Sequence, residues 1–174
     1  MAKKTLTFIS MILKQKQERQ IQAVLLIRDL DTHGQEKRRF KSLQDSRINH
    51  KSIDSDLQVV IGAAKSKREA WVLNGFIPQT TEEEKKLSEI KKKLKFDPCL
   101  EAHRLRGDKK YPEQRDRDAK VVLAQLTEEK FEREQQCWTQ TELELLRDRG
   151  QATGLTDYLH EIETSLLPMI AQSP

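Results

Sequence analysis

The sequence predicts an α/β fold in which a small parallel sheet is followed by a mostly helical C-terminal half. Residues 23–27 and 57–64 are short apolar runs with the composition of buried strands. A helical pattern separates them and another follows, and this alternation is typical of parallel sheets. Because two strands make a thin sheet, either a third strand lies within residues 5–13 or another chain completes the sheet.

The composition predicts a small core inside a heavily charged surface. The chain has 174 residues, of which 36% are hydrophobic and 34% are charged. Its net charge of +4 is too low to indicate wholesale disorder. The longest purely apolar run, residues 23–27, is far too short for a transmembrane helix, so we expect no association with a membrane.

The first residues resemble a secretory signal, but the chain is expected to be cytoplasmic. Leu6, Ile9 and Leu13 fit one face of a helix, and a polar stretch follows where a cleavage site would lie. Cys99 and Cys137 form no CxxC motif, so we expect two free buried thiols in a reducing compartment.

The N-terminal part, residues 1–77, contains the predicted strands. We expect a strand at residues 22–29 that is buried on both faces, and then a basic helix from Gln35 to about Ser46. Phe40 and Leu43 are the apolar contact of this helix. A second buried strand is expected at 57–64, followed by a helix that Ser66 caps and that ends near residue 73.

The C-terminal part, residues 78–174, is expected to be helical and packed on the first. A helix at 82–94, starting after Thr80 or Thr81, places Leu87, Ile90 and Leu94 on one face. A mobile loop at 96–117 precedes a helix at 117–126 with Val122, Leu123 and Leu126 buried, and residues 127–129 open another short one. A later helix is expected to end with Gly150 as its C-cap, and the last one begins at Thr156.

Two aspartates follow the first predicted strand. Asp29 and Asp31 alternate along the chain, so their carboxylates lie on one face just beyond the sheet, where open α/β folds bind ligands. Oxygen ligands of this kind suit Mg²⁺ or Mn²⁺. The alternative interpretation is that one aspartate caps the following turn while the other is solvated.

Glu69 is a third candidate ligand for the same ion. If the two strands are parallel neighbours, Glu69 follows the second one at the edge of the sheet where Asp29 and Asp31 lie. Alternatively, Glu69 only complements the dipole of the helix that it begins.

Positive charge is concentrated near these acids. Residues 1–50 carry 11 Lys and Arg against 5 Asp and Glu, whereas residues 51–174 carry 21 against 23. The helix after Asp31 contributes cations that could neutralise nucleic-acid phosphates, although a merely solvated face is the other interpretation. They are Lys37, Arg38, Arg39, Lys41 and Arg47. The lysines and glutamates of residues 82–95 are expected to pair along their helix, and Trp71 and Trp138 are expected to pack in the core.

Three segments together resemble a divergent Toprim domain, within a family of small bacterial Toprim-like proteins of unknown function. They are residues 23–31, residues 63–73 with their Glu69-Ala70-Trp71 sequence, and a tail that comprises residues 154–159 and 166–168. Toprim domains process nucleic-acid phosphodiesters with Mg²⁺. The resemblance implies a metal-binding role for Asp29 and Asp31, and a supporting metal-binding or catalytic role for Glu69.

The chain departs from the Toprim pattern in one respect. Toprim catalysis also uses a glutamate on an earlier strand, whereas the only acid before Asp29 is Glu18, in a polar helical stretch. Three explanations are open: the start of the chain is truncated or misassigned, a partner donates the strand, or the domain has lost catalysis.

The sequence therefore supports two main functional hypotheses and leaves open whether the protein is an enzyme. The first is a Toprim-like, Mg²⁺-dependent nuclease or nuclease subunit that acts on nucleic acid. The alternative is a catalytically degenerate interaction subunit of a larger bacterial complex, with a protein partner or a second copy completing the sheet. A regulatory nucleic-acid binder is a third hypothesis, weakened because no recognition-helix motif is present.

Overall fold

The structure of the chain, a computed structural model, describes residues 21–30, 34–51 and 57–171. The chain divides into two compact units, which are considered separately below. The sheet unit comprises Met1–Ala63 and Asp157–Pro174, and the helical unit comprises Ala64–Thr156. The helix and the third strand considered for residues 5–13 lie outside the described residues. No helix in the described ranges is long and apolar enough to cross a membrane.

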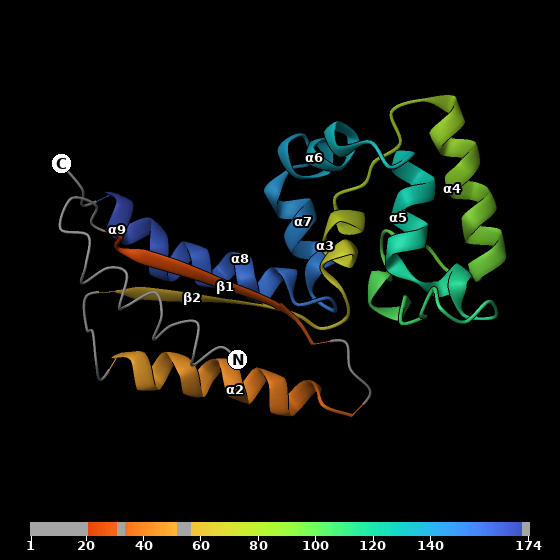
Figure 1. The fold of residues 1–174 in the computed structure, drawn as a ribbon. Helices are drawn as coiled ribbons and strands as arrows, with labels where there is room; N and C mark the ends of the chain where they lie inside the picture. The colour runs from red at the N-terminus through yellow and green to blue at the C-terminus, as the bar shows by residue number, and fades with distance from the viewer. Residues whose placement is uncertain (1–20, 31–33, 52–56, 172–174) are drawn as a thin grey trace. The chain divides into compact units, whose positions relative to one another are not determined.

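The sheet unit contains a strand–helix–strand motif. Strand β1 (Ala23–Asp29) is followed by helix α2 (Glu36–Lys51) and strand β2 (Gln58–Ala64). Within the described residues the strands form a two-stranded parallel sheet (Figure 1). The predicted mixture of a small parallel sheet and a mostly helical remainder is confirmed.

Helices lie on both faces of this sheet (Figure 1). On one face, Leu43 of α2 packs with Leu30 and Ile61. On the other, helix α8 (Leu155–Glu161) continues through the π-helical turn η3 (Ile162–Leu166) into α9 (Leu167–Ala171). A Cβ atom on Gly62 would lie 3.1 Å from the ring of Tyr158, so glycine allows α8 to approach the strand closely.

Glu161 fastens this C-terminal helix to the sheet unit. Its Oε2 accepts a hydrogen bond of 3.1 Å from the backbone N–H of Ile61, and its Oε1 forms an ion pair with Arg47 of α2. One carboxylate near the end of the chain therefore contacts a strand and a helix from the N-terminal part.

The prediction that the first strand is buried on both faces is wrong. Leu25 and Ile27 are 44% and 42% exposed, whereas Val59 and Val60 of β2 are fully buried. Leu25 and Ile27 alternate along β1 and therefore share one face. In the described part of the chain both strands are outer strands of the sheet, and the face of β1 that carries Leu25 and Ile27 is less covered than β2 is.

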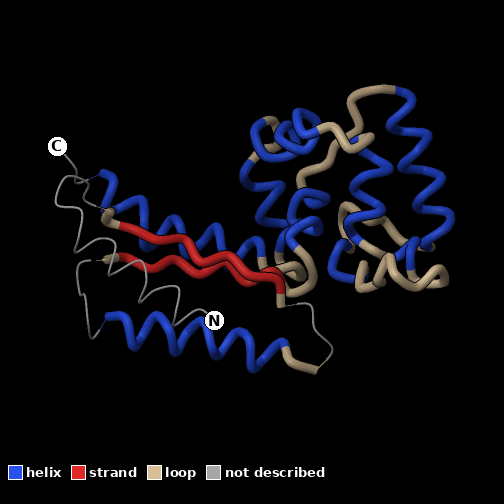
Figure 2. The backbone as a smooth tube through the Cα atoms, viewed as in Figure 1, coloured by secondary structure: helices blue, strands red, loops and turns tan. Residues whose placement is uncertain are grey.

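The helical unit is built from five α-helices and two single 3₁₀ turns (Figure 2). The α-helices are α3 (Arg68–Asn74), α4 (Thr81–Leu94), α5 (Ala119–Thr127), α6 (Phe131–Thr139) and α7 (Leu143–Gly150). The turns are η1 (Ala102–Arg104) and η2 (Arg115–Arg117). The helices agree with the predicted ones, except that α6 begins at Phe131 rather than within residues 127–129.

The core of the helical unit contains the residues that the helical periodicity selected. Leu87 and Leu94 of α4 are buried with Val122, Leu123 and Leu126 of α5. The expected packing of Trp71 is also confirmed, since it is 3% exposed and its indole N–H donates to the carbonyl of Thr153 over 2.9 Å.

Three local expectations are wrong. The N-cap of α3 is Lys67 and not Ser66. Ser66 is buried and lies one residue before the N-cap position, so its hydroxyl does not cap this helix. Trp138 is 37% exposed, since it lies on the outer side of α6. Gly150 is the last residue of α7 rather than its C-cap, and a Cβ there would lie 2.7 Å from the Cβ of Leu155.

The segment expected as a loop, residues 96–117, is held in place at its end by Asp118. The backbone N–H of Gly107 donates to the carbonyl of Arg117 over 2.8 Å, and Arg106 forms an isolated antiparallel bridge with Asp118. Asp118 is 1% exposed, and its carboxylate pairs with the ammonium of Lys67 at 3.0 Å. Burial alone would raise the pKa of Asp118, but hydrogen bonds from Lys67 and from two backbone N–H groups lower it.

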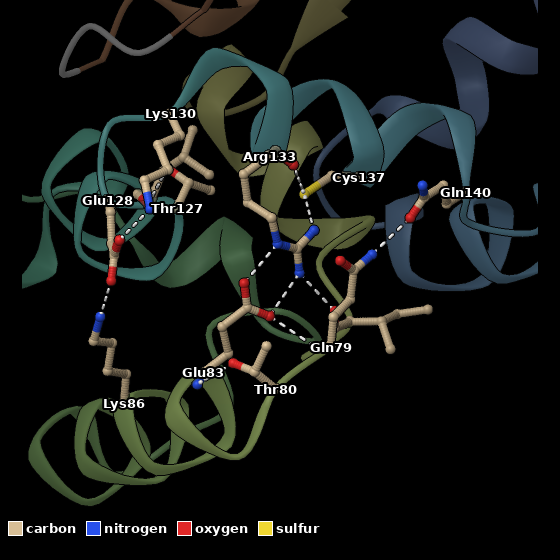
Figure 3. Close-up of polar contacts among 12 residues, drawn as sticks. Gln79, Thr80, Glu83, Lys86, Thr127, Glu128, Lys130, Arg133, Cys137 and Gln140 are labelled. Carbon is tan, nitrogen blue, oxygen red and sulfur yellow. Dashed lines mark hydrogen bonds and ion pairs between the residues drawn. The ribbon is translucent and has the colours of Figure 1, made fainter.

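A buried guanidinium connects α4 and α6 (Figure 3). Arg133 donates to both carboxylate oxygens of Glu83, over 2.7 and 3.0 Å, and to the carbonyl of Ile77 over 2.7 Å. Its guanidinium carbon lies 4.5 Å from the centre of the Phe76 ring. Glu83 also accepts from the backbone N–H of Gln79 over 2.7 Å, so both charges are hydrogen-bonded.

Replacing Gly75 by alanine is expected to destabilise the helical unit. A Cβ atom there would lie 2.0 Å from the backbone oxygen of Cys137, so α6 would have to move. We expect Gly75→Ala to lower the free energy of unfolding by about 1–3 kcal/mol, measured by urea denaturation. Ser88→Ala, at an exposed position of α4, is the control. An unchanged urea midpoint for Gly75→Ala would contradict the close contact.

The Arg133–Glu83 pair is expected to make stability depend on pH in acid. The hydrogen bond from Arg133 lowers the pKa of Glu83 below its usual 4.5. The ion pair therefore contributes its full stabilisation above about pH 4.5. This stabilisation is lost as the pH falls through the lower pKa that Glu83 has in the folded state. We expect Glu83→Gln to lose about 2 kcal/mol at neutral pH, and the difference from wild type to shrink in acid. Chemical denaturation across this pH range measures it, with exposed Glu84→Gln as control; a pH-independent difference would refute the interpretation.

Candidate functional site

The carboxyl end of β1 lies against the basic helix α2. Asp29 is the last residue of the strand and is half-buried. Its backbone carbonyl accepts a hydrogen bond of 3.2 Å from the guanidinium of Arg39. Asp31, the other aspartate of the predicted metal site, lies outside the described residues. The structure thus places one predicted ligand beside one of the predicted phosphate-binding residues.

The exposed side of α2 carries both cations and apolar side chains. Lys37 and Lys41 line an open pocket of about 440 Å³ together with Phe40 and Arg47. Phe40 is 39% exposed, which corrects its expected role as an apolar contact of this helix; only Leu43, at 2%, is buried. The reason is geometric, because positions 37, 40, 41 and 44 follow one face of the helix, and Leu43 points to the sheet.

The four predicted nucleic-acid-binding residues are not equivalent. Lys37, Arg38 and Lys41 are exposed, whereas Arg39 is half-buried and directed to the end of β1. Arg47, the fifth cation of the helix, forms the ion pair with Glu161. The exposed lysines and Arg38 are therefore the cations most accessible to a polyanion.

Glu69 lies in the helical unit, in the first turn of α3. The ammonium of Lys120 is 3.5 Å from its Oε1, and its Oε2 is buried without a hydrogen-bond partner. Burial, together with the charge of Glu69, raises the pKa of the nearby Glu134. Glu69 and Asp29 thus belong to different units, and each has its own cationic neighbour.

Metal-ligating groups are sparse within the described ranges. No cluster of three or more His, Cys, Asp or Glu side chains is found in residues 21–30, 34–51 and 57–171. Because Asp31 lies outside these ranges, the predicted set of Asp29, Asp31 and Glu69 stays a prediction. Burial raises the pKa of Cys99 to about 12 and that of Cys137 to about 11. Both are free buried thiols, as expected, and they are poor metal ligands or nucleophiles at neutral pH.

The sequence interpretation missed a second charged pocket, which lies on the helical unit. Lys109 and Arg115, from the segment expected as a loop, line it together with Lys120 and Glu134. The sequence contained one signal of this pocket, the high density of Lys and Arg between residues 104 and 120. The order of residues alone does not show that these cations lie near α5 and α6.

No protein-family model, curated protein or solved structure matches this chain. The chemistry of its own residues therefore carries the functional inference.

Proposed function

We propose that the protein is a Toprim-like, Mg²⁺-dependent protein that processes nucleic-acid phosphodiesters, as a nuclease or a nuclease subunit. One observation carries this proposal. The carboxylate residue that ends β1, Asp29, is in direct contact with the basic helix α2 through Arg39. An acidic residue that could bind a cation and basic groups that could bind a phosphate chain are therefore adjacent at the carboxyl end of a strand in a parallel sheet, where α/β folds bind their ligands.

The carboxylates of Asp29 and Asp31 would hold Mg²⁺ or Mn²⁺, whereas the assisting metal-binding or catalytic role of Glu69, which belongs to the helical unit, stays a prediction from the sequence. These side chains offer only oxygen donors, which fits a hard divalent cation. When bound, such an ion supplies Lewis-acid stabilisation of negative charge on the phosphate oxygens. Asp29 can bind and orient this ion, because the hydrogen bond from Arg39 fixes the backbone at its position.

The accessible cations of α2 would bind the nucleic-acid backbone. Lys37 and Lys41 lie one turn apart on the exposed side of the helix, with Arg38 next to them. The ring of Phe40, in the same pocket, offers an apolar surface on which a base can stack. Cations interleaved with an aromatic ring are a common arrangement in surfaces that bind single strands.

The metal site is tested by calorimetric titration with Mn²⁺ and Mg²⁺. We expect wild type to bind and Asp29→Asn/Asp31→Asn to lose both binding and nuclease activity on DNA and RNA, while its melting temperature is unchanged or slightly raised by the removed charge repulsion. Asp45→Asn, an exposed acid on α2, is the matched control and should bind as wild type does. No binding by wild type would exclude an independent metal site. A large loss of thermal stability in the double variant would show that the aspartates are structural caps.

The role of α2 is tested by the salt dependence of oligonucleotide binding. With a single-stranded oligonucleotide, Lys37→Ala/Lys41→Ala should weaken binding most at low salt and make the slope of log K against log salt shallower by about 1.4, since each lost phosphate contact removes about 0.7 from the slope. Fluorescence anisotropy measures both quantities. Lys85→Ala/Lys92→Ala, two exposed positions of α4, controls for the loss of charge alone. An unchanged slope in the α2 variant would argue against phosphate contact.

The interaction-subunit hypothesis is a second candidate, and the exposed apolar row of β1 favours it. Leu25 and Ile27 share one face and are 44% and 42% exposed. Exposed apolar side chains on an outer strand are typical of surfaces that a partner covers. Under this hypothesis the wild-type protein binds no metal. It forms a complex with a protein partner or a second copy, which size-exclusion chromatography detects, and Leu25→Lys/Ile27→Lys disrupts this complex. Preserved complex formation by that variant would refute it.

A further inference from the structure

We propose that the open pocket on the helical unit binds a phosphorylated small molecule of nucleotide size. The pocket measures about 590 Å³ and lies along α5. Pockets that bind small molecules commonly have about 300–1,000 Å³, so a nucleoside monophosphate fits. The pocket shares no residue with Asp29, Asp31 or the cations of α2, and the proposal does not depend on the nuclease hypothesis.

Three cations from different elements are among the residues that line this pocket. Lys109 comes from the segment between η1 and η2, Arg115 from η2, and Lys120 from the first turn of α5. Because they are separated along the chain, only the fold brings them together. Two ammonium groups and a planar guanidinium supply the donors that phosphate oxygens accept.

Asp118 holds two of these three residues in place before any ligand arrives. Its Oδ2 accepts the backbone N–H of Lys109 over 2.9 Å, and its Oδ1 accepts that of Lys120 over 2.8 Å. The carboxylate is buried, and the ammonium of Lys67 balances its charge at 3.0 Å. The backbone at both lysines is therefore fixed before a ligand binds, and only their side chains have to become ordered.

Two of the cations are available to an external anion. Several neighbouring cations are engaged by acids, as in the pairs Lys67–Asp118 and Lys93–Asp116. Within the described part of the chain, the side chains of Lys109 and Arg115 contact no carboxylate. Lys120 is 3.5 Å from Glu69, but its side chain is 51% exposed and can turn towards a phosphate.

The other lining residues suit the nucleoside portion of such a ligand. Val121 and Ala124, one turn apart on α5, offer apolar side chains that a base can contact. Gln125 offers an amide that can both donate and accept hydrogen bonds. Glu129 and Glu134 offer acceptors for sugar hydroxyl or amino groups, and their charge disfavours further phosphates. This distribution favours a monophosphate over a polyphosphate or an oligonucleotide.

The proposal is tested by calorimetric titration of the full chain with adenosine monophosphate, adenosine and inorganic phosphate. We expect adenosine monophosphate to bind, and both partial ligands to bind at least about tenfold more weakly, because each lacks one set of contacts. Amide shift changes in a ¹⁵N-labelled sample should be centred on residues 109–134. No binding of adenosine monophosphate at millimolar concentration, or shift changes centred elsewhere, would overturn the proposal.

Two variants with the same change of charge separate a site from general attraction. Arg115→Gln should weaken adenosine monophosphate about tenfold, the usual cost of one charged hydrogen bond. Lys110→Gln removes an exposed neighbouring cation that does not line the pocket, and its affinity should equal that of wild type. Equal weakening by both variants would overturn the proposal.

An oligonucleotide is the discriminating competitor. Suppose that a single-stranded oligonucleotide displaces adenosine monophosphate at a concentration below that of the nucleotide, and that Arg115→Gln weakens binding of the oligonucleotide. The pocket would then be part of a nucleic-acid surface, and the small-molecule proposal would fail. The α2 variants distinguish this failure from that of the nuclease hypothesis, because Lys37→Ala/Lys41→Ala changes oligonucleotide binding without changing this pocket.

Discussion

The buried carboxylate of Asp118 is the interaction on which the arrangement of the helical unit around α5 depends. It accepts the backbone N–H of Lys120 in the first turn of α5, fixes the backbone at Lys109 and balances the charge of Lys67. Lys67 in turn donates to the carbonyl of Gly107 over 2.9 Å, so the same charge pair holds both ends of the segment that contains η2. A carboxylate with this many donors is far less costly to bury than an isolated one, because every transferred charge is compensated.

The two units use charge in different ways. In the helical unit the acids and bases pair across elements: Arg133 with Glu83, Lys67 with Asp118, and Lys91 with Asp97 at 2.6 Å. The first pair joins α6 to α4, the second joins the N-cap residues of α3 and α5, and the third joins α4 to the segment that follows it. Within the described residues of the sheet unit, Lys37, Arg38 and Lys41 of α2 are exposed and form no ion pair, whereas Arg47 is bound to Glu161. Fixed pairs contribute to structure, whereas exposed cations of one sign create a field that attracts polyanions.

Local sequence patterns predicted the elements well, and tertiary contacts explain what they missed. The spacing of apolar residues predicted both strands, because it shows which side of a segment faces a core. The same spacing predicted the burial of Leu87, Leu94, Val122 and Leu126. The exposure of Leu25 could not be predicted, since a strand that is apolar throughout does not reveal how many neighbours it has. The sequence identified Asp29 and α2 as neighbours because they are adjacent in the chain. It could not connect Arg115 to Glu134, which only the folding of η2, α5 and α6 brings to one pocket. The predicted association of Asp29 with Glu69 stays a prediction, because the two residues belong to different units.

The burial of both thiols has a practical consequence. Cys99 and Cys137 are 3% and 1% exposed, and burial raises the pKa values of both well above neutrality, so neither presents a reactive thiolate to reagents in solution. A cysteine introduced on the exposed side of α2 or α5 would therefore be alkylated selectively while the native pair is left unchanged. Fluorophores and spin labels can therefore be attached to an introduced cysteine without first replacing Cys99 or Cys137 in the core.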